Sequence, residues 1–325
     1  MKVAFAGSFA ARLAAPVRAR LSVPGDMIVD DEVGIVPHLA DVDVLVSMAF
    51  SAEMAMGAPR LRLVQVPGAG LDRIDRDAVP SGAHLANAYG HEGGIAEYVI
   101  GAMLALARSF RRLDDRLRQG HWESQWAVGT ATPPLWPELA GRTLGILGLG
   151  HIGQALARRA AAFDMQVRAV QRRTPAELPS GVSSVVGPER LDDILRWADY
   201  LAITLPLSAA TRNLIDAHRL QLMKPTAFLI NVARAEIVEE AALYRALSTG
   251  IIAGAALDVW YRYPTSAEPT LPAGHPFHRL DNVIMTPHVS GWTQGMLDAR
   301  AALIADNIER IARNEMPLNV VSPSS

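Results

Sequence analysis

Short apolar runs alternate with longer amphipathic stretches along the 325-residue chain. Helices that cover both faces of a parallel sheet produce this alternation, because each strand is then buried on both sides. At roughly 150 residues a domain, the length predicts about two α/β domains. The expected buried parallel strands are Val3–Ala6, Val44–Ser47, Leu63–Val66, Leu144–Leu147, Val167–Val170, Tyr200–Thr204, Ala227–Val232 and Val283–Thr286.

Three longer segments complete the pattern. Residues 94–119 carry apolar side chains at helical spacing, including Ile95, Val99 and Leu106, and predict one long helix. Residues 130–137 contain several prolines and are expected to connect the domains. Residues 263–276 carry four prolines and predict a long loop.

Composition and charge exclude several classes of function. The formal charge of −2, from 31 basic and 33 acidic residues, gives no basic surface for nucleic acid or an anionic membrane. The chain has no cysteine, which excludes disulfides and thiolate chemistry and fits a cytoplasmic location. No stretch of about eighteen uncharged apolar residues predicts a membrane span. The apolar N-terminus is broken at Gly7 and Arg12, which favours a buried strand over a signal peptide.

The strongest local signal is a GxGxxG turn at Gly148, Gly150 and Gly153. An expected strand precedes it and a helix-forming run follows, which is the context that dinucleotide binding requires. Gly148 permits the tight turn, Gly150 lets the pyrophosphate approach the backbone, and Gly153 lets the helix pack against the strand. The N-terminus of that helix attracts phosphate through its N–H groups and dipole.

The end of the next expected strand bears on cofactor choice. An acid about 20 residues beyond the turn ordinarily binds the ribose hydroxyls of NAD. Here the strand is followed by Gln171, Arg172 and Arg173, with no acid. Because guanidinium groups attract a 2′-phosphate, the sequence favours NADP(H), with NAD(H) as the alternative if both arginines are solvated loop charges.

Two side chains near the ends of later strands suit the reduction of a 2-oxo acid. His288 is the natural proton donor for a carbonyl oxygen near neutral pH. Arg234 offers a bidentate fork to a carboxylate. Each alone is an ordinary surface or core residue, and only their combination with the glycine turn makes them candidates. His275 and His278 have the spacing HxxH, but they lie in a Pro-rich loop without a third ligand, so no metal is expected.

From about Val64 to Thr293 the sequence resembles the D-isomer-specific 2-hydroxyacid dehydrogenases. The motifs that carry the resemblance are VPGAGLDRID (66–75), IAEYVIGAMLALAR (95–108), LAGRTLGILGLGHIG (139–153), MKPTAFLINVARAEIVEEAAL (223–243), AGAALDV (253–259) and TPHVSGWT (286–293). The resemblance implies two Rossmann-like or flavodoxin-like parallel-sheet domains with the cofactor domain inserted into the substrate domain. It implies residues 1–98 plus 290–325 as the substrate domain and residues 99–289 as the dinucleotide domain, with a homodimer formed through the latter.

The resemblance also assigns roles to residues. His288 matches the general acid/base, Arg234 the substrate-binding arginine, and Asp258 the acid near the nicotinamide carboxamide. The expected substrate residues are Gly68, Ala69, Gly70, His91, Arg234 and His288. The expected cofactor-binding residues are Gly148, Gly150, His151, Ile152, Gly153, Gln171, Arg172, Arg173, Thr204, Leu205, Pro206, Val232, Ala233, Arg234, Asp258, His288 and Gly291.

One departure from the family pattern concerns the partner of the catalytic histidine. The family usually has a Glu five residues beyond the Asp at position 258, and that Glu pairs with the His. Tyr263 stands there in this chain, with Glu268 as the alternative if the loop has shifted. Since a tyrosine is neutral at pH 7, it lacks the charge with which a carboxylate favours the imidazolium. We therefore expect a lower kinetic pKa for His288 than at a Glu-paired site.

The sequence leaves three hypotheses open. The first is an NADPH-dependent oxidoreductase that acts on the CH–OH group of a small D-2-hydroxy acid and reduces the 2-oxo acid, such as glyoxylate or hydroxypyruvate. The second is a non-catalytic NAD(P)-sensing module, suggested by the missing Glu but opposed by Arg234 and His288. The third is a dehydrogenase of another small anion such as formate. Formate dehydrogenases share the family fold and also lack that Glu, with Gln in its place. They have Asn at the position of His91, however, which disfavours formate as the substrate.

Overall fold

The structure is a computed structural model that describes residues 1–22, 25–129 and 133–321. The chain forms two compact units, one from Met1–His91 with Trp292–Ser325 and the other from Glu92–Gly291. The second unit is therefore inserted into the first. In the described residues, no helix is both long and apolar enough to cross a membrane.

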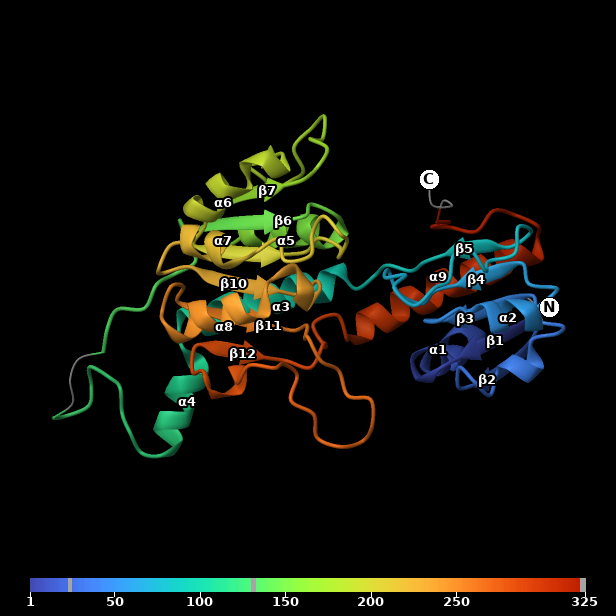
Figure 1. Cartoon of the computed structure of the whole chain (residues 1–325), viewed down its shortest axis with the longest axis horizontal. Helices are drawn as coiled ribbons and strands as arrows, with labels where there is room; N and C mark the ends of the chain where they lie inside the picture. The colour runs from blue at the N-terminus through green and yellow to red at the C-terminus, as the bar shows by residue number, and fades with distance from the viewer. Residues whose placement is uncertain (23–24, 130–132, 322–325) are drawn as a thin grey trace. The chain divides into compact units, whose positions relative to one another are not determined.

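The first unit is built on a parallel sheet with the order β2-β1-β3-β4-β5. Its strands are β1 (Lys2–Ala6), β2 (Asp26–Asp30), β3 (Val44–Ser47), β4 (Leu63–Gln65) and β5 (His84–Ala86) (Figure 1). Helices α1 (Ser8–Arg18) and α9 (Gln294–Ala312) share one apolar cluster with the sheet. A second cluster holds residues from α2 (Ala52–Gly57) and the short helix η1 (Val36–His38). The C-terminal helix thus completes the core that the N-terminal strands begin.

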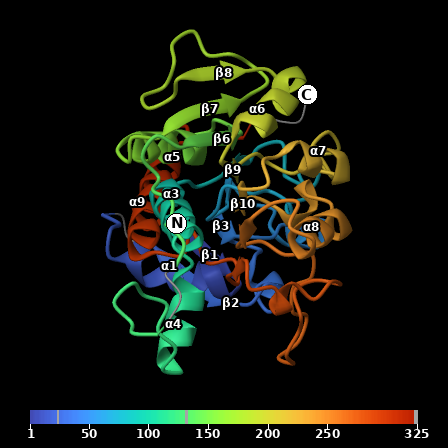
Figure 2. The same cartoon turned by 90° about the vertical axis from the view of Figure 1, so that its left-hand side faces the viewer.

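The second unit is built on a parallel sheet with the order β12-β11-β10-β9-β6-β7-β8. Its strands are β6 (Thr143–Leu147), β7 (Gln166–Val170), β8 (Ser184–Val186), β9 (Tyr200–Ile203), β10 (Phe228–Asn231), β11 (Gly254–Leu257) and β12 (Val283–Met285). On one side of the sheet lie α3 (Glu92–Ala107) and α5 (His151–Ala161), and on the other α6 (Leu191–Trp197), α7 (Ala217–Leu222) and α8 (Glu240–Ser248) (Figure 2). The sheet is therefore covered on both faces.

Each sheet has a point at which its strand order reverses. In the second unit, β6 and β9 are neighbours, and the chain proceeds outward from them in opposite directions. In the first unit, β1 and β3 stand in the same relation. In open α/β sheets, ligands bind beyond the carboxyl ends of the strands at such a point. The loops after β6 and β9 are therefore where a nucleotide is expected.

The predicted fold class is confirmed, since both units are parallel-sheet α/β structures. Every strand expected from the sequence forms, with its ends displaced by no more than one residue. Strands β2, β5, β8 and β11 were not predicted. The first and third of these are edge strands with exposed or half-buried side chains, so they lack an apolar run.

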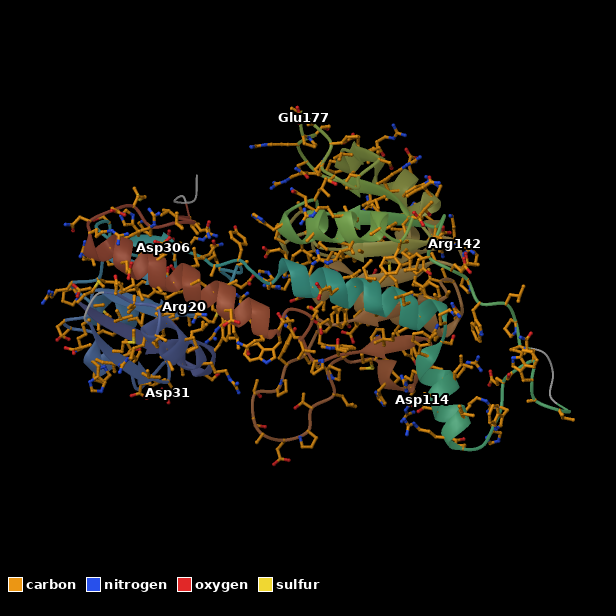
Figure 3. All side chains as sticks on the ribbon, turned by 180° about the vertical axis from the view of Figure 1, so that it is seen from behind. Arg20, Asp31, Asp114, Arg142, Glu177 and Asp306 are labelled. Atoms are coloured by element: carbon orange, nitrogen blue, oxygen red, sulfur yellow. The ribbon has the colours of Figure 1, made fainter. Side chains whose placement is uncertain are left out.

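Two expectations about the inserted unit were wrong. The single helix over residues 94–119 is two helices, because Ser109 adopts a left-handed conformation (φ 50) between α3 and α4 (Phe110–Arg118). Helix α4 buries none of its side chains and carries charged groups, Asp114 among them (Figure 3). Residues 133–137 lie within the second unit and do not connect the domains, while residues 130–132 are outside the described residues. Residues 263–276 form the expected long loop, without helix or strand.

Candidate active site

The glycine turn has the geometry that its spacing predicts. Gly148 has φ 99, and a Cβ there would lie 2.8 Å from the Cβ of Leu205. A Cβ on Gly153 would lie 2.3 Å from the carbonyl oxygen of Gly148, so helix α5 packs directly on the turn. A Cβ on Gly150 would meet nothing within 4 Å. Gly150 is also the N-cap of α5 and has no side-chain cap, so the backbone at the helix N-terminus is approachable by a phosphate.

The loop after β7 begins beside this turn. The N–H of Gly148 donates to the carbonyl of Val170 over 3.0 Å, which joins the turn to the last residue of β7. Gln171 is half-buried, and the side chains of Arg172 and Arg173 are exposed. Neither arginine takes part in an ion pair among the described residues. Glu177 lies further along the same loop, at its outer end (Figure 3). The sequence expectation of two arginines and no acid directly after β7 therefore corresponds to two exposed cations next to the glycine turn.

The loops after β9 and β10 reach the same edge of the sheet. The hydroxyl of Thr204 donates to the carbonyl of Gly148 over 2.6 Å, and its N–H donates to the carbonyl of Leu147 over 2.9 Å. After β10, the buried amide of Asn231 accepts from the N–H of Ala233 and donates to the carbonyl of Arg234. Asn231 therefore fixes the backbone of the turn from which Arg234 projects. Asn231 was not among the site residues predicted from the sequence, although an Asn within an apolar run is a usable signal.

A short segment after β12, residues 286–290, carries His288 and is here called the strap. The carboxylate of Asp258 is fully buried and accepts hydrogen bonds from three strap groups: the Thr286 hydroxyl (2.6 Å), the Val289 N–H (2.9 Å) and the Ser290 N–H (2.8 Å). The carbonyl of Thr286 accepts from the indole N–H of Trp260 over 2.8 Å. Within this frame His288 has φ 58, a left-handed conformation that residues other than glycine rarely adopt.

The imidazole of His288 is paired with Tyr263. Its Nδ1 lies 2.7 Å from the Tyr263 hydroxyl oxygen, which also accepts weakly from the N–H of Trp260 at 3.4 Å. Glu268 is exposed, and in the described part of the chain its carboxylate makes no bond to the ring. The structure thus brings Tyr263 to His288 and leaves Glu268 away from it.

The electrostatics of this pair favour neutral groups. Partial removal of water by the surrounding protein lowers the pKa of His288 below its ordinary value, although the residue is still exposed at the surface, and the positive charge of Arg234 lowers it further. The negative charge of Asp258 acts in the opposite direction but does not reverse the shift. Partial removal of water likewise raises the pKa of Tyr263, which is still 48% exposed, so its hydroxyl stays protonated at neutral pH. The pair is a neutral phenol hydrogen-bonded to a weakly basic imidazole.

In the first unit the expected substrate residues follow the carboxyl ends of β4 and β5. The N–H of Ala88 donates to the carbonyl of Gly68, and the side-chain amide of Asn87 donates to the carbonyl of Ala69 over 3.1 Å. The loop through Gly68, Ala69 and Gly70 is thereby fixed to the end of β5. Three residues further on, Nδ1 of His91 lies 3.0 Å from a guanidinium nitrogen of Arg300 in α9. Since that nitrogen is a donor, Nδ1 accepts and the ring is the Nε2–H tautomer.

No metal centre is indicated in the described residues, where no group of three or more His, Cys, Asp or Glu side chains has the geometry to hold an ion. His275 instead stacks on Tyr244 with ring centroids 5.1 Å apart. The two rings belong to the packing of the long loop against α8.

Residues 100–290 match the model of the family described as D-isomer specific 2-hydroxyacid dehydrogenase, NAD binding domain. The chain belongs to this family. As a member, it is an NAD(P)-dependent 2-hydroxyacid dehydrogenase, an oxidoreductase with a nicotinamide cofactor. The resemblance drawn from the sequence motifs is thereby confirmed. The family comparison does not support the hypothesis of a non-catalytic sensing module.

Similar proteins agree with this membership. The chain is 35% identical over 296 residues to a glyoxylate reductase of Pyrococcus furiosus, covering 89% of this chain and 84% of that protein. It is 34% identical over 296 residues to a D-3-phosphoglycerate dehydrogenase of Methanocaldococcus jannaschii, covering 89% of this chain and 53% of that protein. Among solved structures, an NADPH-dependent glyoxylate/hydroxypyruvate reductase of Sinorhizobium meliloti in complex with citrate matches with a TM-score of 0.81, 28% identity and coverage of 99% and 97%.

Proposed function

We propose that the chain reduces a small 2-oxo acid of the glyoxylate or hydroxypyruvate kind to its D-2-hydroxy acid, with NADPH as the preferred hydride donor. The observation that carries the proposal is the pairing of His288 Nδ1 with Tyr263 at 2.7 Å, on a strap that Asp258 holds. Because Nδ1 is occupied, Nε2 is the nitrogen that exchanges a proton with substrate. The named relatives, which include glyoxylate reductases, support the substrate class.

The residues around the glycine turn fit a dinucleotide. Gly150 leaves the N-terminus of α5 open to the pyrophosphate, and Thr204 and Leu205 contact the turn at Gly148. In this proposal the turns at Thr204–Pro206 and Val232–Arg234 line the nucleotide. When bound, the cofactor supplies the hydride. Arg172 and Arg173 bind the 2′-phosphate of NADP(H) in this proposal, with Gln171 beside them. The other cofactor contacts proposed are His151, Ile152, Gly153, Leu205, Pro206, Val232, Ala233, Asp258, His288 and Gly291.

On the substrate, the imidazolium form of His288 would give its Nε2 proton to the carbonyl oxygen and be left as the neutral ring, with its Nδ1–H donated to Tyr263. Arg234 binds the carboxylate and polarises the carbonyl, since its planar guanidinium matches both oxygens. Tyr263 orients the imidazole in place of the family Glu. Asp258 is already bonded three times to the strap, so its role in this proposal is to hold that strap beside the nicotinamide.

The first unit is proposed to bind the substrate and the inserted unit to bind the cofactor. The backbone of Gly68, Ala69 and Gly70 receives the carboxylate, and the Nε2–H of His91 faces the substrate. The pinned geometry of this loop, through Asn87 and Ala88, supports a rigid binding surface. Rigid backbone donors bind a carboxylate without losing conformational entropy on binding.

We also propose that the chain forms a homodimer through the inserted unit. The segment after α4, residues 120–129 with 133–136, is here called the arm. Trp126 is 84% exposed, and Val128 and Leu135 are almost completely so. Large apolar side chains concentrated on one segment are characteristic of a protein interface. We propose that the arm packs against the inserted unit of a second copy of the chain.

The experiment is a spectrophotometric assay of NADPH and NADH consumption by the purified chain with a panel of small 2-oxo acids and with formate plus NAD(P)⁺. We expect NADPH consumption with glyoxylate or hydroxypyruvate. His288→Asn should abolish turnover while nucleotide binding, measured by fluorescence titration, persists. Turnover that survives in His288→Asn contradicts the assigned acid, and activity with formate alone contradicts the substrate class.

A further inference from the structure

The strap is held by a hydroxyl relay that begins outside the strap, on helix α3. The hydroxyl of Tyr98 lies 2.7 Å from the hydroxyl oxygen of Thr286, which in turn lies 2.6 Å from the carboxylate of Asp258. Tyr98 and Thr286 are 188 residues apart in sequence but belong to the same unit. The relay therefore links the helix behind the sheet to the segment that carries His288.

The direction of each hydrogen bond in this relay is determined by chemistry. A carboxylate only accepts, so the Thr286 hydroxyl must donate its single proton to Asp258. The Thr286 oxygen then has only lone pairs left, and Tyr98 must be the donor to it. Burial raises the pKa of Tyr98 to about 12, so the phenol is protonated and able to donate throughout the neutral range.

Both sides of His288 depend on the groups at the end of this relay. Before His288, the carbonyl of Thr286 accepts from Trp260 over 2.8 Å and from the N–H of His288 over 3.0 Å. After His288, the N–H groups of Val289 and Ser290 donate to Asp258. A left-handed residue persists only where its surroundings restrain the backbone on both sides. Displacement of Thr286 or Asp258 therefore displaces the imidazole.

We propose that Tyr98 is a positioning residue for His288 and acts through Thr286 and Asp258. The inference rests on the proposed function of His288 and adds a residue that does not touch the reacting atoms. Tyr98 strengthens the donation from Thr286, because a hydroxyl that accepts a hydrogen bond becomes a better donor. A firmly bonded Asp258 then holds the strap and exposes less of its negative charge to the imidazole.

The groups that act on the imidazole make the sign of the effect predictable. Tyr263 occupies Nδ1, Arg234 disfavours the imidazolium, and Asp258 favours it, while Glu236 and Asp258 both act on Tyr263. When Tyr98 loses its hydroxyl, Thr286 becomes a weaker donor and the charge of Asp258 is less neutralised. The pKa of His288 should therefore rise in Tyr98→Phe, while loosening of the strap lowers kcat.

The test compares four variants by two independent readouts. Tyr98→Phe keeps the ring in the core and removes the donor, Thr286→Val breaks both bonds, and Thr286→Ser restores the hydroxyl. Tyr261→Phe is the matched control, because it removes a part-buried tyrosine hydrogen bond of 2.8 Å, to the carbonyl of Val238, outside the relay. The readouts are NMR titration of the His288 ring, assigned with His288→Asn, and kcat with KM for the 2-oxo acid and NADPH.

We expect Tyr98→Phe to lower kcat about three- to tenfold with KM changed less than twofold, and to raise the His288 titration midpoint. Thr286→Val should have the larger effect, and Thr286→Ser and Tyr261→Phe should resemble the unchanged protein in both readouts. If Tyr98→Phe changes the His288 titration midpoint and kcat no more than the control Tyr261→Phe does, the proposal is overturned. The NMR titration needs no turnover, so it decides the role of Tyr98 even if no 2-oxo acid proves to be a substrate.

Discussion

The hydroxyl of Tyr263 bonds to Nδ1 of His288 over 2.7 Å, where the family ordinarily supplies a carboxylate. The direction of this bond follows the charge of the ring: the neutral imidazole accepts the Tyr263 proton at Nδ1, whereas the imidazolium donates its Nδ1–H to the phenol oxygen, which also accepts from the N–H of Trp260. A phenol that donates to Nδ1 stabilises the neutral ring, whereas a carboxylate that accepts from Nδ1–H stabilises the imidazolium. Tyr263 therefore preserves the orientation of the histidine but not the electrostatic support that a carboxylate gives to its charged form.

Tyr263→Glu should raise the pKa of His288. In the direction of reduction the imidazolium is the active form, so the rate falls as the pH rises through this pKa. The existing shift is downward, which places that decline at a lower pH than for an ordinary histidine. A carboxylate within contact distance should move the alkaline limb of kcat/KM upward by about 1–3 pH units. The measurement is the pH profile of NADPH oxidation with saturating nucleotide.

The control for this change is Glu268→Gln. Glu268 is exposed and is not bonded to the ring, so its neutralisation should leave the profile in place. If the pH profile of Tyr263→Glu superimposes on that of the unchanged protein, the proposed role of Tyr263 as the partner of His288 is wrong. A shift produced by Glu268→Gln instead would assign the partner role to Glu268.

The extent to which this site could be predicted differs between residues. The glycine turn, Arg234 and His288 follow strands whose apolar runs are visible in the sequence. The role of Tyr98 could not be predicted, because a tyrosine in an apolar helix is ordinarily a packing residue and its partner Thr286 lies 188 residues away in the sequence. Residue spacing carries no information about which hydroxyl donates to which.

The same distinction holds for the fold. Strand β11 reads Gly-Ala-Ala-Leu, which has little intrinsic strand propensity, and it forms because β10 and β12 bond to it on both sides. The break between α3 and α4 was missed for a related reason. Apolar spacing continues through Leu106 and Phe110, whereas the left-handed backbone of Ser109 leaves no trace in that pattern.

Alanine substitutions within the glycine turn should separate binding from folding. In Gly153→Ala, the new Cβ would lie 2.3 Å from the carbonyl of Gly148, so α5 must shift and the unit should lose stability. In Gly150→Ala, the new Cβ has no neighbouring protein atom within 4 Å, so the fold should persist. The methyl group nevertheless occupies the approach to the helix N-terminus and should weaken NADPH binding at least tenfold. Thermal unfolding and fluorescence titration measure the two effects, and equal loss of melting temperature in both variants would contradict the distinction.

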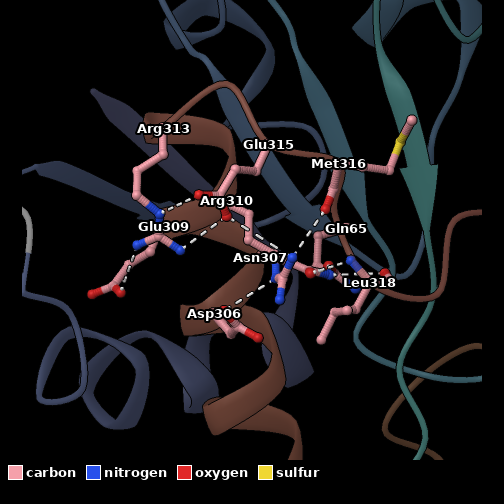
Figure 4. A network of polar contacts seen from close by, with 9 residues as sticks. All are labelled: Gln65, Asp306, Asn307, Glu309, Arg310, Arg313, Glu315, Met316 and Leu318. Carbon is pink, nitrogen blue, oxygen red and sulfur yellow. Dashed lines mark hydrogen bonds and ion pairs between the residues drawn. The ribbon is translucent and has the colours of Figure 1, made fainter.

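A buried polar cluster should anchor the C-terminal segment of the first unit. Asn307 in α9 and Gln65 in β4 are both fully buried (Figure 4). The side-chain nitrogen of Asn307 donates to the side-chain oxygen of Gln65 over 2.7 Å and to the Leu318 carbonyl. The side-chain oxygen of Asn307 accepts from the Leu318 N–H. Asn307→Ala leaves these partners unpaired and should cost about 1–3 kcal/mol in urea unfolding. Asp306→Ala, on the same helix but at a half-exposed ion pair with Arg310, should cost less, at most about 1 kcal/mol. Equal costs would mean that the cluster contributes little.

Polar substitution on the arm should dissociate the proposed homodimer. Trp126→Ser removes the largest exposed apolar side chain of the arm, and light scattering after gel filtration should show a shift from dimer to monomer. Val33→Ser is the control, since Val33 is 82% exposed but belongs to the first unit. A chain that is monomeric without substitution, or a dimer that survives Trp126→Ser and its combination with Val128→Ser, contradicts the interface.

The arginines after β7 should determine the choice of nucleotide. Each would form a charge-assisted bond to the 2′-phosphate, a contact that contributes about 1.5–3 kcal/mol. Arg172→Ala with Arg173→Ala should therefore raise KM for NADPH at least tenfold and leave KM for NADH nearly unchanged, because NADH has no such phosphate. Gln171→Asp should act in the same direction by repelling the phosphate and binding the ribose hydroxyls. Arg190→Ala, an exposed arginine elsewhere in the unit, is the matched control. Parallel losses for both nucleotides would show that Arg172 and Arg173 contact the shared pyrophosphate, and the preference for NADP(H) would then be wrong.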